Sequence, residues 1–144
     1  MKAIETSIIL KANTAKVWQE LMNFDSYPEW NPFITKLSGE AIESKQIEAH
    51  IKLGSKKVQK FKPEVLTVSI NKEFRWKGKL FFKGLFDGEH YFILEELEDN
   101  TCKFVHGERF SGLFSKLILS MIIDDTKAGF EKMNQALKEL VESK

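Results

Sequence analysis

The periodicity of the chain switches near residue 112 and stays helical to its last residues, and this switch limits the folds that the chain can adopt. From Leu113 to Glu142, apolar residues recur every three or four positions, which indicates one long amphipathic helix. Before it, apolar and polar residues alternate through successive segments bounded by turn residues, as in an antiparallel sheet. A sheet with one apolar face and a single long helix bury those faces against each other. We therefore expect one sheet wrapped around one helix.

The expected strands occupy residues 2–11, 47–53, 61–70, 73–83, 86–97 and 101–110. Between the first two, Asn13 or Thr14 can cap a short amphipathic helix. Ser26 and Glu29 have capping-box spacing for a second helical turn. His50 alternates with the apolar residues of its strand, so we expect it to face solvent.

The last hairpin can be registered from its sequence. If Glu98–Asn100 is a three-residue loop with Asn100 in the left-handed conformation, the apolar residues of both strands share one face. A two-residue loop would place Phe92 and Phe104 on opposite faces. The three-residue loop pairs Leu94 with Phe104, Phe92 with His106, and His90 with Glu108. We therefore expect His90, His106 and Glu108 together on the concave face of the sheet.

These three polar residues admit several interpretations. The favoured one is that they satisfy one another or a backbone group beside the last helix. They could instead hydrogen-bond a ligand, or His106 and Glu108 could act as an acid–base pair. The spacings of known zinc motifs are not present, so we expect no metal site and no other cofactor.

The first half of the long helix carries an apolar stripe, and Asp125 falls inside it. We interpret Asp125 as solvated near a pocket mouth, because Asp124 is adjacent. The later stripe is expected to be plain core packing, although Met121 and Met133 could adapt to an irregular ligand. The first stripe comprises Phe114, Ile118, Met121, Ile122 and Gly129, and the later one Phe130, Met133, Leu137 and Leu140.

Composition narrows the functional classes. The 22 Lys and Arg nearly balance the 21 Asp and Glu, which gives a net charge of +1 and no field suited to nucleic acid. The local basic cluster Lys56, Lys57, Lys60 and Lys62 is interpreted as a solvated rim. Cys102 is the single cysteine and cannot form an internal disulfide, which favours a reducing cytoplasm. No window approaches the apolar length of a membrane span, so no stable membrane association is expected.

Five segments together resemble the SRPBCC superfamily, which includes START-related, polyketide cyclase/dehydrase-like and birch-pollen-allergen-like proteins. The segments are Val17-Trp18, YPEWNPF from Tyr27 to Phe33, Phe92 and Leu94 after Gly88 and His90, FVHGERFSGLF from Phe104 to Phe114, and GFEKMNQAL from Gly129 to Leu137. The resemblance implies a single α+β domain over residues 1–144 with a helix-grip fold. In that fold a curved antiparallel sheet of about seven strands wraps a long C-terminal helix, and two short helices follow the first strand.

The resemblance also implies a cavity between sheet and helix that holds hydrophobic ligands in many members. We therefore expect binding or transport of a small hydrophobic ligand, such as a lipid, a sterol or a polyketide-like molecule, by a monomer or weak homodimer. The alternative is a polyketide cyclase/dehydratase-like enzyme that uses the same cavity. Trp30 and Phe33 would be wall or lid residues, or would anchor the second short helix. The candidate ligand-binding residues are Trp30, Phe33, Trp76, His90, Phe92, His106, Glu108, Phe110, Ile118, Ile122 and Asp125.

Overall fold

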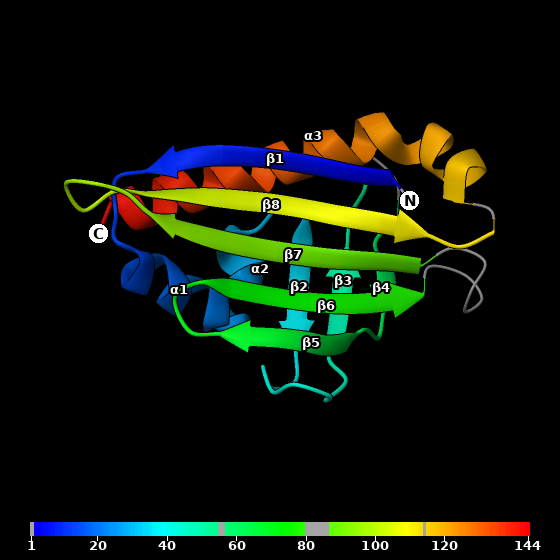
Figure 1. The fold of residues 1–144 in the computed structure, drawn as a ribbon, viewed down its shortest axis with the longest axis horizontal. Coiled ribbons are helices and arrows are strands. Elements are labelled where there is room, and N and C mark those ends of the chain that lie inside the picture. The colour runs from blue at the N-terminus through cyan, green and yellow to red at the C-terminus, as the bar shows by residue number, and fades with distance from the viewer. Residues whose placement is uncertain (1, 55–56, 80–86, 114) are drawn as a thin grey trace.

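The computed structural model describes residues 2–54, 57–79, 87–113 and 115–144, and they form an α+β fold (Figure 1). The strands are β1 (Lys2–Leu10), β2 (Ile34–Ser38), β3 (Glu48–Ile51), β4 (Gln59–Phe61), β5 (Glu64–Ser69), β6 (Glu73–Lys79), β7 (Asp87–Glu96) and β8 (Cys102–Ser111). The helices are α1 (Thr14–Met22), the 3-10 turn η1 (Phe24–Ser26), α2 (Tyr27–Trp30) and α3 (Ser115–Glu142).

The strands form two antiparallel sheets. The larger has the order β1-β8-β7-β6-β5, and the smaller has the order β2-β3-β4. In Figure 1, α3 runs along the far side of the larger sheet behind β1 and β8, and the small sheet crosses behind β6 and β5. Backbone hydrogen bonds join the two sheets, since the amide of Ile47 donates to Pro63 and that of Ser44 donates to Val65. The apolar core lies between the larger sheet on one side and α3 and the small sheet on the other.

The register of the last hairpin agrees with the prediction. Leu94 pairs with Phe104, and His90 pairs with Glu108. The amide of Leu97 donates to the carbonyl of Thr101 across a three-residue loop. Both Asp99 and Asn100 adopt the left-handed conformation there, with φ of 56° and 55°. Inward-facing positions are therefore even-numbered in both β7 and β8.

Other expectations about the strands need correction. The sequence analysis missed β2, because a bulge between Ile34 and Lys36 breaks the period of two and leaves Ile34 and Leu37 as its buried residues. The strand expected over 61–70 is two strands, β4 and β5, separated at Pro63. The side chain of His50 lies on the opposite face of β3 from that of Ala49, as expected. It is nevertheless only 15% exposed, because it pairs with Glu48 at 2.8 Å. Residues 80–83 and 86, expected to be strand, lie outside the described residues.

The buried face of α3 differs from the predicted stripe. Met121 is 73% exposed and lies on the outer side, and Leu140 is only partly buried. The buried residues are Leu119, Thr126, Gly129, Phe130, Met133, Asn134, Leu137 and Val141. Phe114 and Lys56 lie outside the described residues, and Lys57, Lys60 and Lys62 are exposed as expected. The helix thus presents two polar residues, Thr126 and Asn134, to the sheet.

Candidate functional site

The two histidines of the last hairpin form the centre of the candidate site. His90 on β7 and His106 on β8 are 1% and 0% exposed on the inward face of the larger sheet. Trp76 stacks on the ring of His90, with 4.9 Å between the centroids and 10° between the planes. Phe130 of α3 stacks on His106 at 4.1 Å and 15°. We call these four residues and Phe33, which contacts both histidines, the aromatic cage.

A chain of hydrogen bonds runs through the cage. The Nε2 atoms of His90 and His106 lie 2.8 Å apart. His106 Nδ1 is 2.9 Å from Asn134 Oδ1, and Asn134 Nδ2 donates to Thr6 Oγ1 at 2.8 Å. The Thr6 hydroxyl in turn donates to the backbone carbonyl of His106 at 3.1 Å. At the other end, His90 Nδ1 is 3.4 Å from Glu108 Oε1. The chain therefore joins β1, β7, β8 and α3.

The interior keeps His106 neutral. Complete burial lowers the pKa of His106 well below its ordinary value, and the neighbouring His90 lowers this pKa further. Hydrogen bonds from the ring to Asn134 and to the backbone carbonyl of Phe130 oppose the shift without cancelling it. A neutral imidazole has one N–H and one lone pair, so both ring nitrogens of His106 are already committed within the protein.

Glu108 lies at the edge of the cage and is its accessible polar group. Its side chain is 13% exposed, although it faces inward between Ile4 of β1 and His90 of β7. The next inward positions along the sheet hold two glycines side by side, Gly78 on β6 and Gly88 on β7. Among the described residues, only Pro63 comes within 4 Å of a Cβ added at Gly78. Beside the aromatic cage, two paired positions of the sheet therefore carry no side chain of their own, and we call them the glycine floor.

The helix α3 carries a further buried polar group, Thr126. The Thr126 side chain is buried, and its hydroxyl has no hydrogen-bond partner among the described residues. Thr126 lies about two turns before Asn134, which is bonded to His106. The start of α3 is at the same end of the molecule as the end of β8 (Figure 1). The buried Nε1 of Trp30 and Nδ2 of Asn31 also have no partner among the described residues.

The structure brings together most of the residues singled out from the sequence. Phe33, Trp76, His90, Phe92 and His106 meet in or against the cage, and Glu108 borders it. Phe110 is buried on the same face, beside Gly88. Ile118 and Ile122 are partly buried against the core.

Two of the candidates lie away from the cage. Asp125 is near Gly54 and lines a separate surface pocket of about 250 Å³ with Lys52 and Lys132. Trp30 packs on Tyr27, with 5.3 Å between the ring centroids, and so belongs to the packing of α2.

Sequence reasoning missed Thr6 and Asn134. Signals for both were available. Asn134 interrupts the apolar run between Phe130 and Leu137 on the helix. Thr6 lies between Ile4 and Ile8 on the same face of β1. A polar residue within an apolar face needs a partner when it is buried. Within the described residues no group of three or more His, Cys, Asp or Glu is arranged to hold a metal ion.

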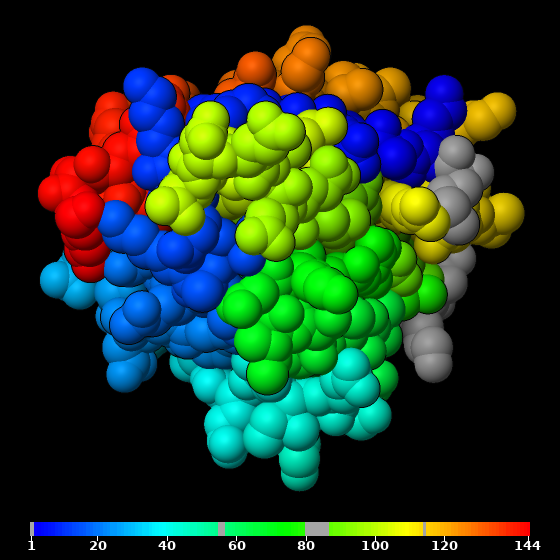
Figure 2. Space-filling model, turned by 60° about the vertical axis from the view of Figure 1, so that its left-hand side comes forward, coloured from blue at the N-terminus to red at the C-terminus, as the bar shows by residue number. Residues whose placement is uncertain are grey.

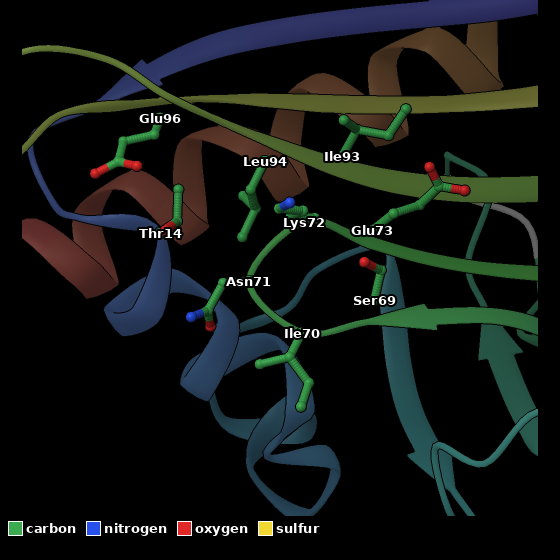
Figure 3. A pocket seen from close by; sticks show the side chains of 9 residues that line it. All are labelled: Thr14, Ser69, Ile70, Asn71, Lys72, Glu73, Ile93, Leu94 and Glu96. Carbon is green, nitrogen blue, oxygen red and sulfur yellow. The ribbon is translucent and has the colours of Figure 1, made fainter.

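A shallow depression of about 570 Å³ lies at another place on the surface, where the β5–β6 turn meets β7 and the start of α1 (Figure 3). Its lining is as apolar as it is polar, with the side chains of Asn71, Glu73 and Glu96 around Leu94. Figure 2 shows this end of the molecule, where β-strand ends, α1 and the end of α3 pack closely together. The depression shares none of the candidate residues.

The long C-terminal helix, the antiparallel sheets and the short helices after the first strand define an α+β protein of the helix-grip class. The chain belongs to the family described as "Polyketide cyclase / dehydrase and lipid transport", whose sequence model matches residues 1–142. No curated protein matches it significantly. In the described part of the chain, no helix is both long and apolar enough to span a membrane.

Solved structures show the same fold at low sequence identity. Protein MLL2253 from Mesorhizobium loti is 14% identical with a TM-score of 0.75, and the match covers 99% of this chain and 98% of that one. A START superfamily protein from Mycobacterium smegmatis is 14% identical with a TM-score of 0.72, covering 98% and 97%. The Zhui aromatase/cyclase from Streptomyces sp. R1128 is 11% identical with a TM-score of 0.73, covering 98% and 93%.

Proposed function

We propose that this protein binds a small hydrophobic ligand between the larger sheet and the first half of α3, next to Glu108. The observation that carries the proposal is the pair of inward-facing glycines, Gly78 and Gly88, beside a cage built of large rings. A sheet face that packs on a helix is normally filled by side chains, because interiors are close-packed. The glycine floor leaves room on this face, and α3 carries a buried hydroxyl, that of Thr126, without a partner among the described residues; both support a site for a guest molecule.

The proposal assigns roles to the candidate residues. Phe110, Ile118 and Ile122 would contact the apolar body of the ligand, whose burial supplies the affinity. Trp76, His90, Phe92 and His106 would form the closed end wall, with Phe33 holding the cage against α3. Glu108 would meet a polar group of the ligand. Asp125 would lie outside, near the entrance. The description of the family, which includes lipid transport, supports a carrier.

A cyclase- or dehydratase-like enzyme is the second candidate, and one observation favours it. Glu108 is partly exposed and stands 3.4 Å from a buried imidazole, so a proton could pass between the two residues. Both ring nitrogens of His106 are occupied, so Glu108 and not His106 would face a substrate. In that case Glu108→Gln would abolish turnover of an aromatic polyketide substrate while leaving its binding intact.

The experiment that tests ligand binding is native mass spectrometry of the purified protein, followed by organic extraction and identification of co-purifying molecules. The matched variants are Gly88→Leu, which fills the floor, and Glu95→Leu, which adds the same side chain at an exposed, outward position of the same strand. We expect a ligand at near one-to-one stoichiometry that is lost only in Gly88→Leu. An empty protein that also fails to bind fatty acids, sterols and aromatic polyketides would refute the proposal.

A further inference from the structure

We propose that the ligand carries a hydroxyl group, as an alcohol or a phenol, which donates a hydrogen bond to the pair formed by Glu108 and His90. This inference rests on the proposed function and adds the chemical class of the ligand. It comes from the direction of the hydrogen bonds in the buried chain, because each link decides which atom of the next residue carries a proton.

The donor-to-acceptor direction of the hydrogen-bond chain is fixed at one end by a backbone carbonyl. The carbonyl oxygen of His106 can only accept, so the hydroxyl of Thr6 must donate to it. Thr6 Oγ1 therefore accepts from the amide group of Asn134, which turns Asn134 Oδ1 toward the ring of His106. An amide oxygen also only accepts, so the proton on His106 resides on Nδ1.

The same logic continues through the two rings. Since His106 is neutral and protonated on Nδ1, its Nε2 carries a lone pair and accepts a hydrogen bond from Nε2 of His90. The Nε2 of His90 therefore carries a proton. The remaining ring nitrogen of His90, Nδ1, faces Glu108 at the accessible end of the chain.

The free end of the chain is an acceptor both when no proton lies between His90 and Glu108 and when one proton lies between Nδ1 and Oε1. If Glu108 is ionised and His90 neutral, the Nδ1 lone pair and both carboxylate oxygens accept. If one proton lies between Nδ1 and Oε1, on either residue, it is held within the pair, and Oε2 of Glu108 still accepts. The separation of 3.4 Å exceeds that of an ordinary hydrogen bond, so the pair is not closed tightly on itself.

The ligand must then bring the donor. A neutral hydroxyl fits better than an ammonium group, because a charged group would have to leave water for a wall of aromatic and aliphatic side chains. A carbonyl or an ether offers only lone pairs and would face the lone pairs of Glu108.

The test compares three probes with one ring system, 2-naphthol, 2-methoxynaphthalene and 2-acetylnaphthalene, by isothermal titration calorimetry on the intact protein. Only 2-naphthol donates a hydrogen bond. One hydrogen bond to a buried acceptor corresponds to roughly tenfold in affinity. We expect 2-naphthol to bind about tenfold more tightly than the other two. Equal affinities, or tighter binding of 2-acetylnaphthalene, would refute the hydroxyl assignment and leave ligand binding itself intact. Failure of all three probes to bind, together with an empty protein in the extraction experiment and no binding of fatty acids, sterols or aromatic polyketides, would refute the proposed function itself.

Two variants locate the effect. Glu108→Gln keeps an acceptor, since its amide group can donate to Nδ1 of His90 while its oxygen remains free, so it should keep the preference for 2-naphthol. Glu108→Leu removes the acceptor and covers Nδ1, so it should lose most of the preference. The control Glu95→Leu should behave like the parent protein. A preference that survives in Glu108→Leu would place the hydroxyl elsewhere.

An independent measurement needs no ligand. Nitrogen-15 NMR of the imidazole rings distinguishes the two neutral tautomers, and the chain has only three histidines to assign. We expect the proton of His106 on Nδ1 and that of His90 on Nε2. A proton on Nε2 of His106 would reverse the chain of hydrogen bonds and overturn the inference.

Discussion

Replacing Gly129 by alanine tests how tightly the cage is held against α3. An ideal Cβ at Gly129 would lie 2.5 Å from Cδ1 and 2.8 Å from Cε1 of Phe33. The Phe33 ring cannot retreat easily, because it is 2% exposed and packs edge-on against Phe130 at 5.3 Å. Alanine improves helix propensity by about 1 kcal/mol, whereas overpacking a core costs about 1–3 kcal/mol. We expect Gly129→Ala to lower the free energy of unfolding by about 1 kcal/mol.

The assay is urea unfolding monitored by circular dichroism, repeated in a Phe33→Val background. Valine has no atoms at the positions of Cδ1 and Cε1, so there Gly129→Ala should become stabilising by about 1 kcal/mol. Ser120→Ala, at an exposed position of the same helix, is the control and should change stability by less than about 0.5 kcal/mol. Stabilisation by Gly129→Ala in the parent protein, or the same destabilisation in both backgrounds, would refute the reasoning.

Three further predictions follow from the pKa shifts. Folding lowers the pKa of His106. Below about pH 6.5, the His106 imidazole is therefore protonated in the unfolded chain but not in the folded chain. Stability should therefore fall by up to about 1.4 kcal/mol per pH unit as the pH drops below this value, and urea unfolding of His106→Gln should lack that contribution. In an absorbance titration, neither tyrosine should ionise near pH 10. Burial raises the pKa of Tyr27, and burial together with the hydrogen bond to Glu5 raises the pKa of Tyr91 to about 12. The variant Glu5→Gln should therefore lower the pKa of Tyr91. Burial raises the pKa of Cys102 to about 11, so a thiol reagent at about pH 8 should react only as fast as the protein unfolds, and rapid labelling would contradict this packing.

The sequence predicted the parts of the fold that local patterns specify. The last hairpin was registered correctly because a three-residue loop, unlike a two-residue loop, places Phe92, Phe104 and His106 on one face. The strand β2 was missed because its bulge destroys the alternation on which strand prediction depends. The resemblance in sequence motifs led to the helix-grip fold, which the comparisons support.

The candidate site was predictable only in part. Alternation placed His90, His106 and Glu108 together, because residues two apart on a strand share a face. The pairing of Asn134 with His106 depends on how α3 is positioned along β8, which no local pattern specifies. Met121, which the sequence placed on the apolar stripe, is exposed for a similar reason. A stripe of apolar residues does not determine which of its edges contacts the sheet.

The chain of hydrogen bonds from Thr6 to Glu108 also constrains which amino-acid substitutions can accumulate during evolution. Each member has one suitable partner atom in its neighbour, so a single replacement at Thr6, His106 or Asn134 leaves a buried polar atom without a partner. Such an atom costs about 1–3 kcal/mol, a large share of the stability of a small domain. Among relatives, these positions should therefore be substituted together, with the whole set either polar or replaced by apolar side chains.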